Sequence, residues 1–129
     1  MQHIGHITLL VNDYDEAIAF YCTKLKFTVV EDKIMSETKR WVLIAPQGST
    51  ATSLLLTKAT TELQRSLIGN QSADKVFMFL FTDNLSGDYE NLMKQGVEII
   101  EVPEVKPHGK VLIFSDLYGN HVDLIEPTL

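Results

Sequence analysis

The chain has 129 residues, of which 45% are hydrophobic and 22% charged, and a formal net charge of −6, which is typical of one globular domain. The acidic charge excludes nucleic acid as the expected partner, because phosphates bind to basic surfaces, and the single cysteine excludes an intrachain disulfide. No apolar run approaches the ~20 residues that cross a bilayer, and no secretory signal opens the sequence, so we expect a cytoplasmic protein without a membrane partner.

The first predicted elements are a strand, a helix and a second strand. Residues 3–11 are rich in aliphatic and β-branched side chains and predict a strand. Asp13 then provides an N-cap, and Glu16 three residues later completes a pattern like a capping box. Apolar side chains at helical spacing predict a helix over residues 14–25, and the β-rich residues 27–32 predict the next strand.

A hairpin and an irregular segment follow. Residues 41–45 and 53–57 are apolar runs, and the sequence Pro-Gln-Gly-Ser between them is a turn signal, so the two runs predict a hairpin. Residues 58–74 are polar and irregular, and they predict a linker. Three aliphatic side chains within residues 63–68 support a short helix there.

The rest of the chain predicts a second set of the same elements. Residues 76–82 are apolar throughout and rich in phenylalanine, which predicts a strand buried on both faces. A helix is predicted to begin at Asp83 and Asn84 and to end at Gly96. The later elements are predicted as strands over residues 97–102, 110–115 and 121–126, a loop over residues 103–109 and a turn over residues 116–120.

The order of one strand, one helix and three strands therefore occurs twice, which calls for a test of internal repetition. Residues 29–31 match residues 99–101 at an offset of 70, and residues 54–56 match residues 122–124 at an offset of 68. These ordered matches predict two duplicated halves, with a ligand pocket where their sheets face each other. The predicted halves are residues 3–57 and 75–127, joined by a linker over residues 58–74.

Two segments carry a resemblance to a known superfamily. The segment HITLLVNDYDEAIAFYCTKLKF, which starts at His6, resembles the opening strand, turn and helix of vicinal-oxygen-chelate proteins, the superfamily of glyoxalases, bleomycin resistance proteins and extradiol dioxygenases. The segment PHGKVLIFSDLYGNHVDLIEP, which starts at Pro107, is similar to the closing loop and strands of these proteins. Lys26 replaces a usual glycine in the first segment, and Leu117 and Asp123 replace a usual proline and glutamate in the second.

This resemblance implies an α+β fold over residues 1–129 as a single domain. In that fold, two βαβββ repeats form a cup-shaped, partly open β-barrel around a small-molecule pocket. The resemblance also implies a homodimer, in which the cup combines halves from one chain or from two.

The resemblance further implies four positions for a divalent metal, two in each half. Carried over onto this sequence, these positions are His6, Leu55, Val76 or Phe77, and Asp123. Aliphatic and aromatic side chains have no electron pair for a metal, and catalytic sites usually keep about three protein ligands. We therefore predict no cofactor, and the sequence argues against a conventional glyoxalase I.

The first functional hypothesis is a small-molecule-binding protein with an incomplete metal site, of the kind that sequesters a ligand. The acidic charge and the aromatic strands favour it, because a small-molecule pocket is mostly apolar and often aromatic. The side chains predicted to bind the ligand are His6, Trp41, Leu55, Phe77, Phe79, His108, Phe114 and Asp123.

The alternative hypothesis is an enzyme, a metal-dependent lyase, isomerase or dioxygenase. His121 lies two residues before Asp123, so both side chains share one face of a strand. Together with His6 they would make a histidine–histidine–carboxylate triad that suits zinc, nickel, manganese or iron. In the competing interpretation, His121 lies at the solvent rim and Asp123 pairs with a neighbour. A structural or regulatory partner domain is a third hypothesis.

Overall fold

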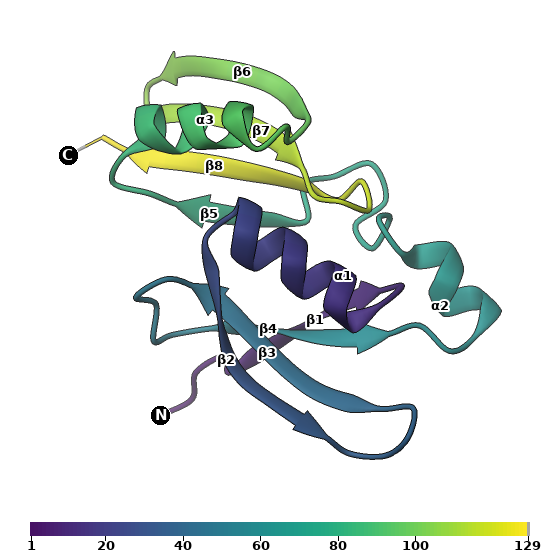
Figure 1. Ribbon diagram of the computed structural model, residues 1–129. Helices are drawn as coiled ribbons and strands as arrows, with labels where there is room; N and C mark the ends of the chain where they lie inside the picture. Colours follow the sequence, from purple (N-terminus) through teal and green to yellow (C-terminus); the bar gives the residue numbers. More distant parts are fainter. Residues whose placement is uncertain (129) are drawn as a thin grey trace. The chain divides into compact units, whose positions relative to one another are not determined.

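The computed structural model describes residues 1–128, which form two compact units divided between Ile68 and Gly69 (Figure 1). Each unit contains one four-stranded sheet, and each has a strand, a helical segment and three further strands in that order. The predicted α+β class and the twofold βαβββ order are therefore confirmed. No helix among the described residues is long and apolar enough to cross a membrane.

The first unit has the sheet order β1-β4-β3-β2. Strands β1 and β4 are parallel, and the other neighbours are antiparallel. Its elements are β1 (His6–Val11), α1 (Tyr14–Ile18), the π-helical segment η1 (Ala19–Lys24), β2 (Phe27–Ile34), β3 (Arg40–Pro46), β4 (Ser53–Lys58) and α2 (Glu62–Leu67).

The second unit has the sheet order β5-β8-β7-β6, so each strand has the same neighbours as its counterpart in the first unit. Strands β5 and β8 are parallel, and the other neighbours are again antiparallel. Its elements are β5 (Met78–Phe81), α3 (Leu85–Lys94), β6 (Ile99–Lys106), β7 (Gly109–Ser115) and β8 (His121–Pro127).

The first helix begins as predicted and ends differently. The Asp13 carboxylate accepts a hydrogen bond from the Glu16 backbone N–H at 2.9 Å, which confirms the predicted N-cap. The single helix predicted over residues 14–25 is divided, because the α-helical pattern gives way at Ala19 to the wider π-helical pattern. Beyond it, Lys26 has a φ of 62°, a left-handed conformation that glycine adopts more readily.

Strand β5 differs from its prediction in length and in burial, whereas α3 begins where it was predicted. Strand β5 has four residues, and the prediction that it is buried on both faces is wrong, because Phe79 and Phe81 are exposed. Only one face of this strand is covered, which a run of apolar letters does not reveal. The N-cap of α3 is Asn84, whose side chain accepts a hydrogen bond from the Gly87 N–H at 3.1 Å.

Strand β6 is longer than predicted. It extends through Lys106, so the loop predicted over residues 103–109 is wrong for its first four residues, and this end of β6 pairs with β7. The register shifts on both sides of Glu101, and Pro103 lies within the second shift. A proline has no N–H to donate, and a bulge tolerates that loss.

Each sheet has one face that forms a core. In the second unit, α3 packs against β6 and β8 and buries Leu85 and Leu92. The most deeply buried sheet residues on that helix-covered face are at most 3% exposed, and they are Leu112, Phe114, Val122 and Leu124. The most deeply buried sheet residues of the first unit are Leu9, Val11, Val42, Ile44 and Leu56.

A buried turn joins β7 to β8 and fixes the start of β8. The Asp116 carboxylate accepts hydrogen bonds from the backbone N–H groups of Tyr118 and Asn120, both at 2.9 Å, and from the Asn120 side-chain amide at 3.0 Å. Gly69, with a φ of 76°, lies so close to the Tyr118 carbonyl that a Cβ atom would collide with it. The segment that begins at Gly69 therefore lies directly against the residues that precede His121.

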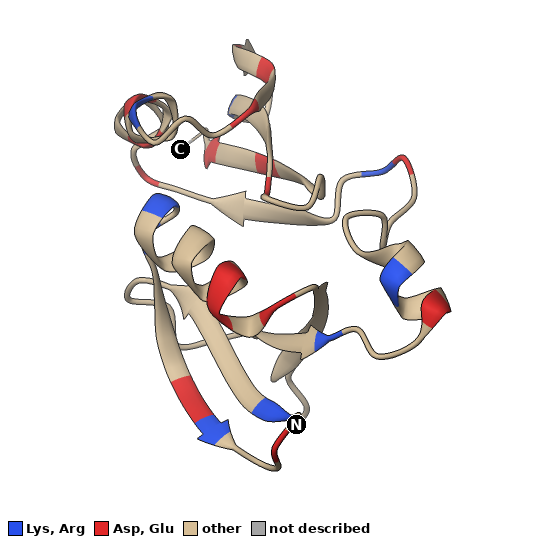
Figure 2. Ribbon diagram, turned by 45° about the vertical axis from the view of Figure 1, so that its right-hand side comes forward, with Lys and Arg blue, Asp and Glu red and all other residues tan. Residues whose placement is uncertain are grey.

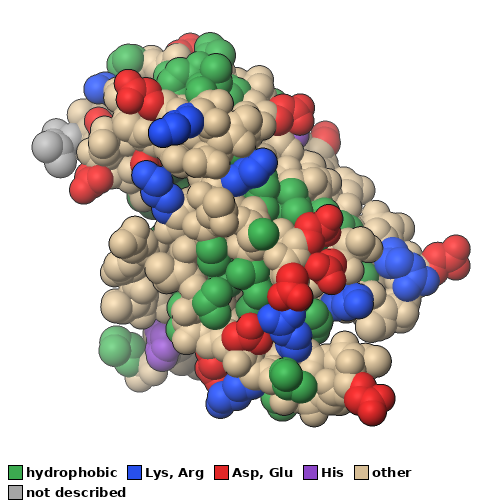
Figure 3. Space-filling view, in the orientation of Figure 1, with side chains coloured by type: hydrophobic (Ala, Val, Ile, Leu, Met, Phe, Trp, Pro, Cys, Tyr) green, Lys and Arg blue, Asp and Glu red, His purple; other side chains and the backbone are tan. Residues whose placement is uncertain are grey.

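The charged and apolar surfaces are distributed differently. Acidic and basic residues are scattered over strands, helices and loops of both units (Figure 2). Exposed apolar side chains occur on β6, where Ile100, Val102 and Val105 are 39%, 66% and 79% exposed, and hydrophobic side chains gather over this strand at the top of Figure 3. Strand β6 is an edge of its sheet, so this apolar surface adjoins unpaired backbone groups.

Candidate functional site

The face of the second sheet opposite its helix-covered core carries a candidate site, and we call it the open face. Its central row crosses all four strands, since Phe79 pairs with Asp123, Asp123 with Ile113, and Ile113 with Glu101. Alternation along β5 places Phe81 on the same face as Phe79. A phenylalanine edge and a central carboxylate therefore share one surface.

The phenylalanines of the open face are exposed to an unusual degree. Phe79 is 61% exposed and Phe81 is 67% exposed. Leaving large apolar side chains in water forgoes the free energy of their burial, and a grouped apolar surface commonly marks a binding site. The two rings offer an apolar platform at the edge strand β5.

Asp123 is the charged centre of the open face. Its Oδ1 atom is buried and has no hydrogen-bond partner among the described residues. Burial raises the pKa of this carboxyl group above its ordinary value, the negative charge of Glu101 raises the pKa further, and His108 and Lys106 act in the opposite direction. A buried carboxylate oxygen without a partner is unfavourable, so a ligand that donates a hydrogen bond or carries positive charge would stabilise it.

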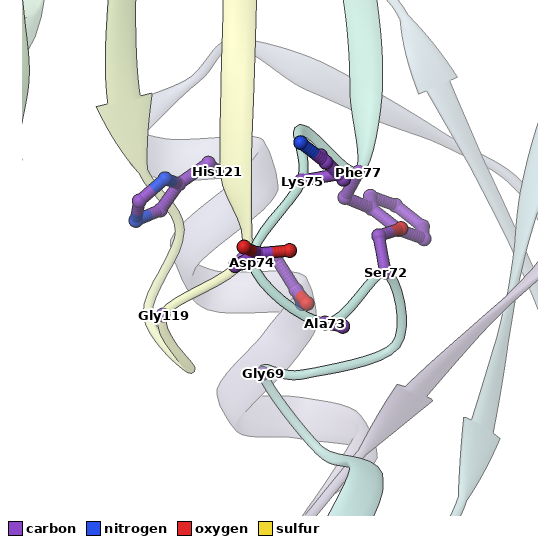
Figure 4. A pocket seen from close by; sticks show the side chains of 9 residues that line it. Gly69, Ser72, Ala73, Asp74, Lys75, Phe77, Gly119 and His121 are labelled. Carbon is purple, nitrogen blue, oxygen red and sulfur yellow. The ribbon is translucent and has the colours of Figure 1, made fainter.

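A small hollow lies where the open face begins. The Phe77 N–H donates a hydrogen bond to the His121 carbonyl at 2.8 Å. Phe77 and His121 precede Phe79 and Asp123 by two residues, and their side chains lie at opposite sides of the hollow (Figure 4). Its volume of about 40 Å³ suits a water molecule or a small chemical group, and it is far below the ~300 Å³ of the smallest drug-sized pockets. The hollow is lined by Gly69, Ser72, Ala73, Asp74, Lys75, Phe77, Gly119, Asn120 and His121.

The first unit has the same row with different chemistry. Thr8 pairs with Leu55, Leu55 with Leu43, and Leu43 with Glu31, so a leucine occupies the place of the central carboxylate. Glu31 forms an ion pair with Lys33 at 2.7 Å, whereas Glu101 has no ion-pair partner among residues 1–128. The unbalanced negative charge is therefore a property of the second unit.

The predicted site residues fall into separate groups. Those on the open face are Phe77, Phe79, His121 and Asp123. Phe114 lies on the helix-covered face and is 1% exposed, so it offers no surface to a ligand. His108 is exposed at the turn between β6 and β7, and its electrostatic interaction with Asp123 lowers the pKa of that carboxyl group.

The other predicted residues belong to the first unit. The rings of His6 and Trp41 lie edge to face, with their centroids 6.0 Å apart. His6 is exposed, and Leu55 is half-buried in the central row. The predicted triad thus draws one member from the first unit and two, His121 and Asp123, from strand β8 of the second.

Phe81 and Glu101, which lie on the open face, were not among the predicted ligand-binding residues. Phe81 continues the period-two alternation of Phe77 and Phe79, and that signal is present in the sequence. Glu101 joins the row only through the register of three strand pairs, which a single sequence does not specify.

The residues present do not fit the metal site that the sequence resemblance implies. Phe77, rather than Val76, is the counterpart of His6, because each precedes the central row of its sheet by two residues. Phe77 and Leu55 have no electron pair to donate. Among residues 1–128, no three His, Cys, Asp or Glu side chains are grouped closely enough to hold a metal ion.

Comparison with protein families and with curated proteins gives matches over nearly the whole chain. The model of the Glyoxalase/Bleomycin resistance protein/Dioxygenase superfamily matches residues 3–124. An uncharacterized protein of Shewanella frigidimarina (strain NCIMB 400) is 47% identical over 126 residues, which make up 97% of this chain and 93% of that protein.

Crystal structures are also similar over nearly the whole chain, among them those of UcmS2 and TnmS3. UcmS2 is 29% identical with a TM-score of 0.85, and the match covers 98% of each chain. TnmS3, an antibiotic binding protein from Streptomyces sp. CB03234, is 26% identical with a TM-score of 0.81, and the match covers 99% of this chain and 98% of that one. Since the family model spans nearly all of its residues, the chain belongs to the glyoxalase/bleomycin resistance protein/dioxygenase superfamily.

Proposed function

We propose that this protein binds a small molecule on the open face and acts by binding rather than by metal-dependent catalysis. One observation carries the proposal: the exposed Phe79 is the register partner of Asp123, whose buried Oδ1 has no partner among the described residues, and the exposed Phe81 extends the same edge. Apolar surface with a few polar groups that fix orientation is the usual composition of a small-molecule site. The antibiotic-binding activity named for TnmS3 supports sequestration of a ligand as the role of this chain.

The metal-dependent lyase, isomerase or dioxygenase is the less favoured proposal. His121 and Asp123 share one strand face, but two donors fall short of the three that catalytic sites usually keep. A third ligand from His6 is the requirement of this alternative, and the measurement of metal content described below tests it.

We also propose a homodimer in the cytoplasm. Both sheets end in edge strands with exposed aliphatic side chains, such as Ile34 on β2 and Val105 on β6, at 82% and 79% exposure. A second chain that covers such edges would bury apolar surface and pair free backbone groups. The single cysteine is consistent with a reducing compartment. Light scattering after size-exclusion chromatography tests the dimer, and a monomer at about 100 μM would refute it, because a stable interface persists at this concentration.

A ligand screen followed by matched variants tests the binding function. Antibiotics with planar ring systems, together with metal-free bleomycin, are screened by thermal shift, and hits are titrated by calorimetry. Phe79→Ala is expected to weaken binding by about tenfold, because it removes one face of the apolar contact. Val102→Ala, which trims a comparably exposed side chain on β6, is expected to change affinity by less than about twofold. A panel without a hit, or a Phe79→Ala protein that binds like the wild type, argues against the open face.

The metal content of protein purified without chelators separates the two proposals. We expect well under about 0.1 equivalent of zinc, nickel, manganese or iron, because no three donor side chains are grouped among the described residues. One full equivalent that disappears in both His6→Ala and Asp123→Ala would refute the metal-free proposal and favour the enzyme.

A further inference from the structure

We propose that the open face selects ligands with a cationic nitrogen on a planar apolar body, and that Asp123 is the anchor for the positive charge. This inference rests on the proposed function and names the ligand class. It concerns one occupant of the face, a small cationic molecule, and the argument for it is charge complementarity.

The position of the carboxylate within the aromatic edge is the first part of the argument. Phe79 and Asp123 are register partners on neighbouring strands, so a planar ring over Phe79 brings its substituents to the carboxylate. A cation at that point also lies close to the faces of phenylalanine rings, which attract positive charge. One group on the ligand would thus interact with both features of the open face.

The buried oxygen atom is the second part. Asp123 Oδ1 is withdrawn from solvent and receives no hydrogen bond within the described chain. An N–H donor with positive charge makes a shorter and stronger hydrogen bond to a carboxylate than a neutral donor does. Such a ligand would supply the missing partner and neutralise the charge in the same contact.

The surrounding charges favour a cation over a neutral donor. Glu101 lies in the same row and adds negative potential, while Lys106 and His108 oppose it from the end of β6 and the following turn. His121 is the remaining titratable group on this side of β8. In the first unit the same row has Leu55 at its centre and an ion-paired Glu31, so it offers no corresponding anchor.

Two dyes of opposite charge provide the test. Proflavine is a planar cation, and 1-anilinonaphthalene-8-sulfonate is an aromatic anion of similar size. Fluorescence titrations at pH 7 are expected to show tighter binding of proflavine to the wild type. Asp123→Asn should weaken the binding of proflavine by about tenfold or more, which is the effect of losing one partly buried charge-assisted hydrogen bond. The affinity for the anionic dye should stay the same or increase.

Matched carboxylate variants separate a local contact from general charge. Glu101→Gln is expected to weaken the binding of proflavine by about two- to fivefold, since the charge of Glu101 lies two strands away from Asp123. Glu31→Gln removes the same net charge at the equivalent register of the first unit and is expected to change affinity by less than about twofold. Equal effects of the two glutamine variants would overturn the local assignment.

The possible failures are distinguishable. If both dyes bind and Asp123→Asn affects neither, the cation anchor is wrong and the binding function stands. If neither dye nor any antibiotic binds up to about 1 mM, both proposals are overturned, because weaker binding has no specificity to explain. If Phe79→Ala instead converts a dimer into a monomer without changing dye affinity, the open face is an interface between copies, and the inference is overturned.

Discussion

The two central rows of this protein share one backbone arrangement and differ at the position that decides their chemistry. In the first unit the row is Thr8–Leu55–Leu43–Glu31, and the only carboxylate in it is ion-paired with Lys33. In the second unit the row is Phe79–Asp123–Ile113–Glu101, with a buried carboxylate oxygen that has no partner in the described chain.

The comparison shows that the two repeats have kept their strand pairing more strictly than the side chains in their central rows. A sheet requires only that its strands keep their order and register, and most side chains on an uncovered face are free to change. The second unit therefore tolerates a binding group at a place where the first unit keeps an apolar residue. The variants below test how independent the two units are.

The largest expected effect concerns the turn that sets the start of β8. Asp116→Ala should reduce the free energy of unfolding by about 3 kcal/mol, because it leaves the buried donors of Asn120 and the half-buried N–H of Tyr118 without their acceptor. Asp13→Ala, which removes an exposed helix cap in the first unit, should cost about 1 kcal/mol. Urea denaturation measures both values.

Hydrogen exchange shows where Asp116→Ala acts. Amides of β7 and β8 should lose protection before those of β3 and β4, because the lost acceptor belongs to the second unit alone. Uniform loss of protection would contradict separate stabilities for the two units.

A charge placed at the equivalent position sharpens the comparison. Leu55→Asp should lower stability by about 2 kcal/mol at pH 7, since a half-buried leucine is replaced by a carboxylate. The loss should shrink at pH 4, where the new carboxyl group is partly protonated, while the isosteric Leu55→Asn should show no such pH dependence. A Leu55→Asp protein as stable as the wild type would mean that the two rows have similar surroundings.

Two equivalent helix ends differ in backbone strain. Lys26 and Gly96, 70 residues apart, have φ values of 62° and 72°. Lys26→Gly should raise the free energy of unfolding by about 1 kcal/mol, because glycine adopts this conformation without the side-chain clash. Gly96→Ala should lower stability by about the same amount, and only through the backbone, because no described atom beyond the two adjacent residues lies within 4 Å of the added Cβ. Thermal unfolding measures whether Lys26→Gly and Gly96→Ala change stability in opposite directions.

The smallest effect concerns Asp123 itself. Because its pKa is raised in the folded state, the folded protein binds more protons than the unfolded chain above pH ~4, and stability falls as pH rises through the raised pKa. Asp123→Asn should therefore raise Tm by about 1–3 °C at pH 7 and leave it unchanged at pH 3. A decrease at pH 7 would indicate that Asp123 has a stabilising partner, which is the competing interpretation for this residue.

Several features were determined by the sequence alone. The Asp13 cap and the turn that begins at Asp116 follow from short-range chemistry, in which a side chain bonds to the backbone within four residues. The twofold order of strands follows from apolar patterns, which are also local. The resemblance at both ends of the chain indicated the superfamily for the same reason, since these turns and strand patterns are local. The length of β6 was not predictable, because its pairing past Pro103 depends on bulges that form only against β7.

The tertiary structure decided which predicted residues can meet a ligand. Phe79 and Phe114 are both phenylalanines on strands of one sheet, yet one is 61% exposed and the other 1%. Which face a strand buries depends on the side where α3 packs and on the register of its neighbours, and a shift of one residue exchanges the two faces. For the same reason Glu101 joined Asp123 only through the pairing of β8, β7 and β6, since residues 22 positions apart become neighbours by sheet formation alone.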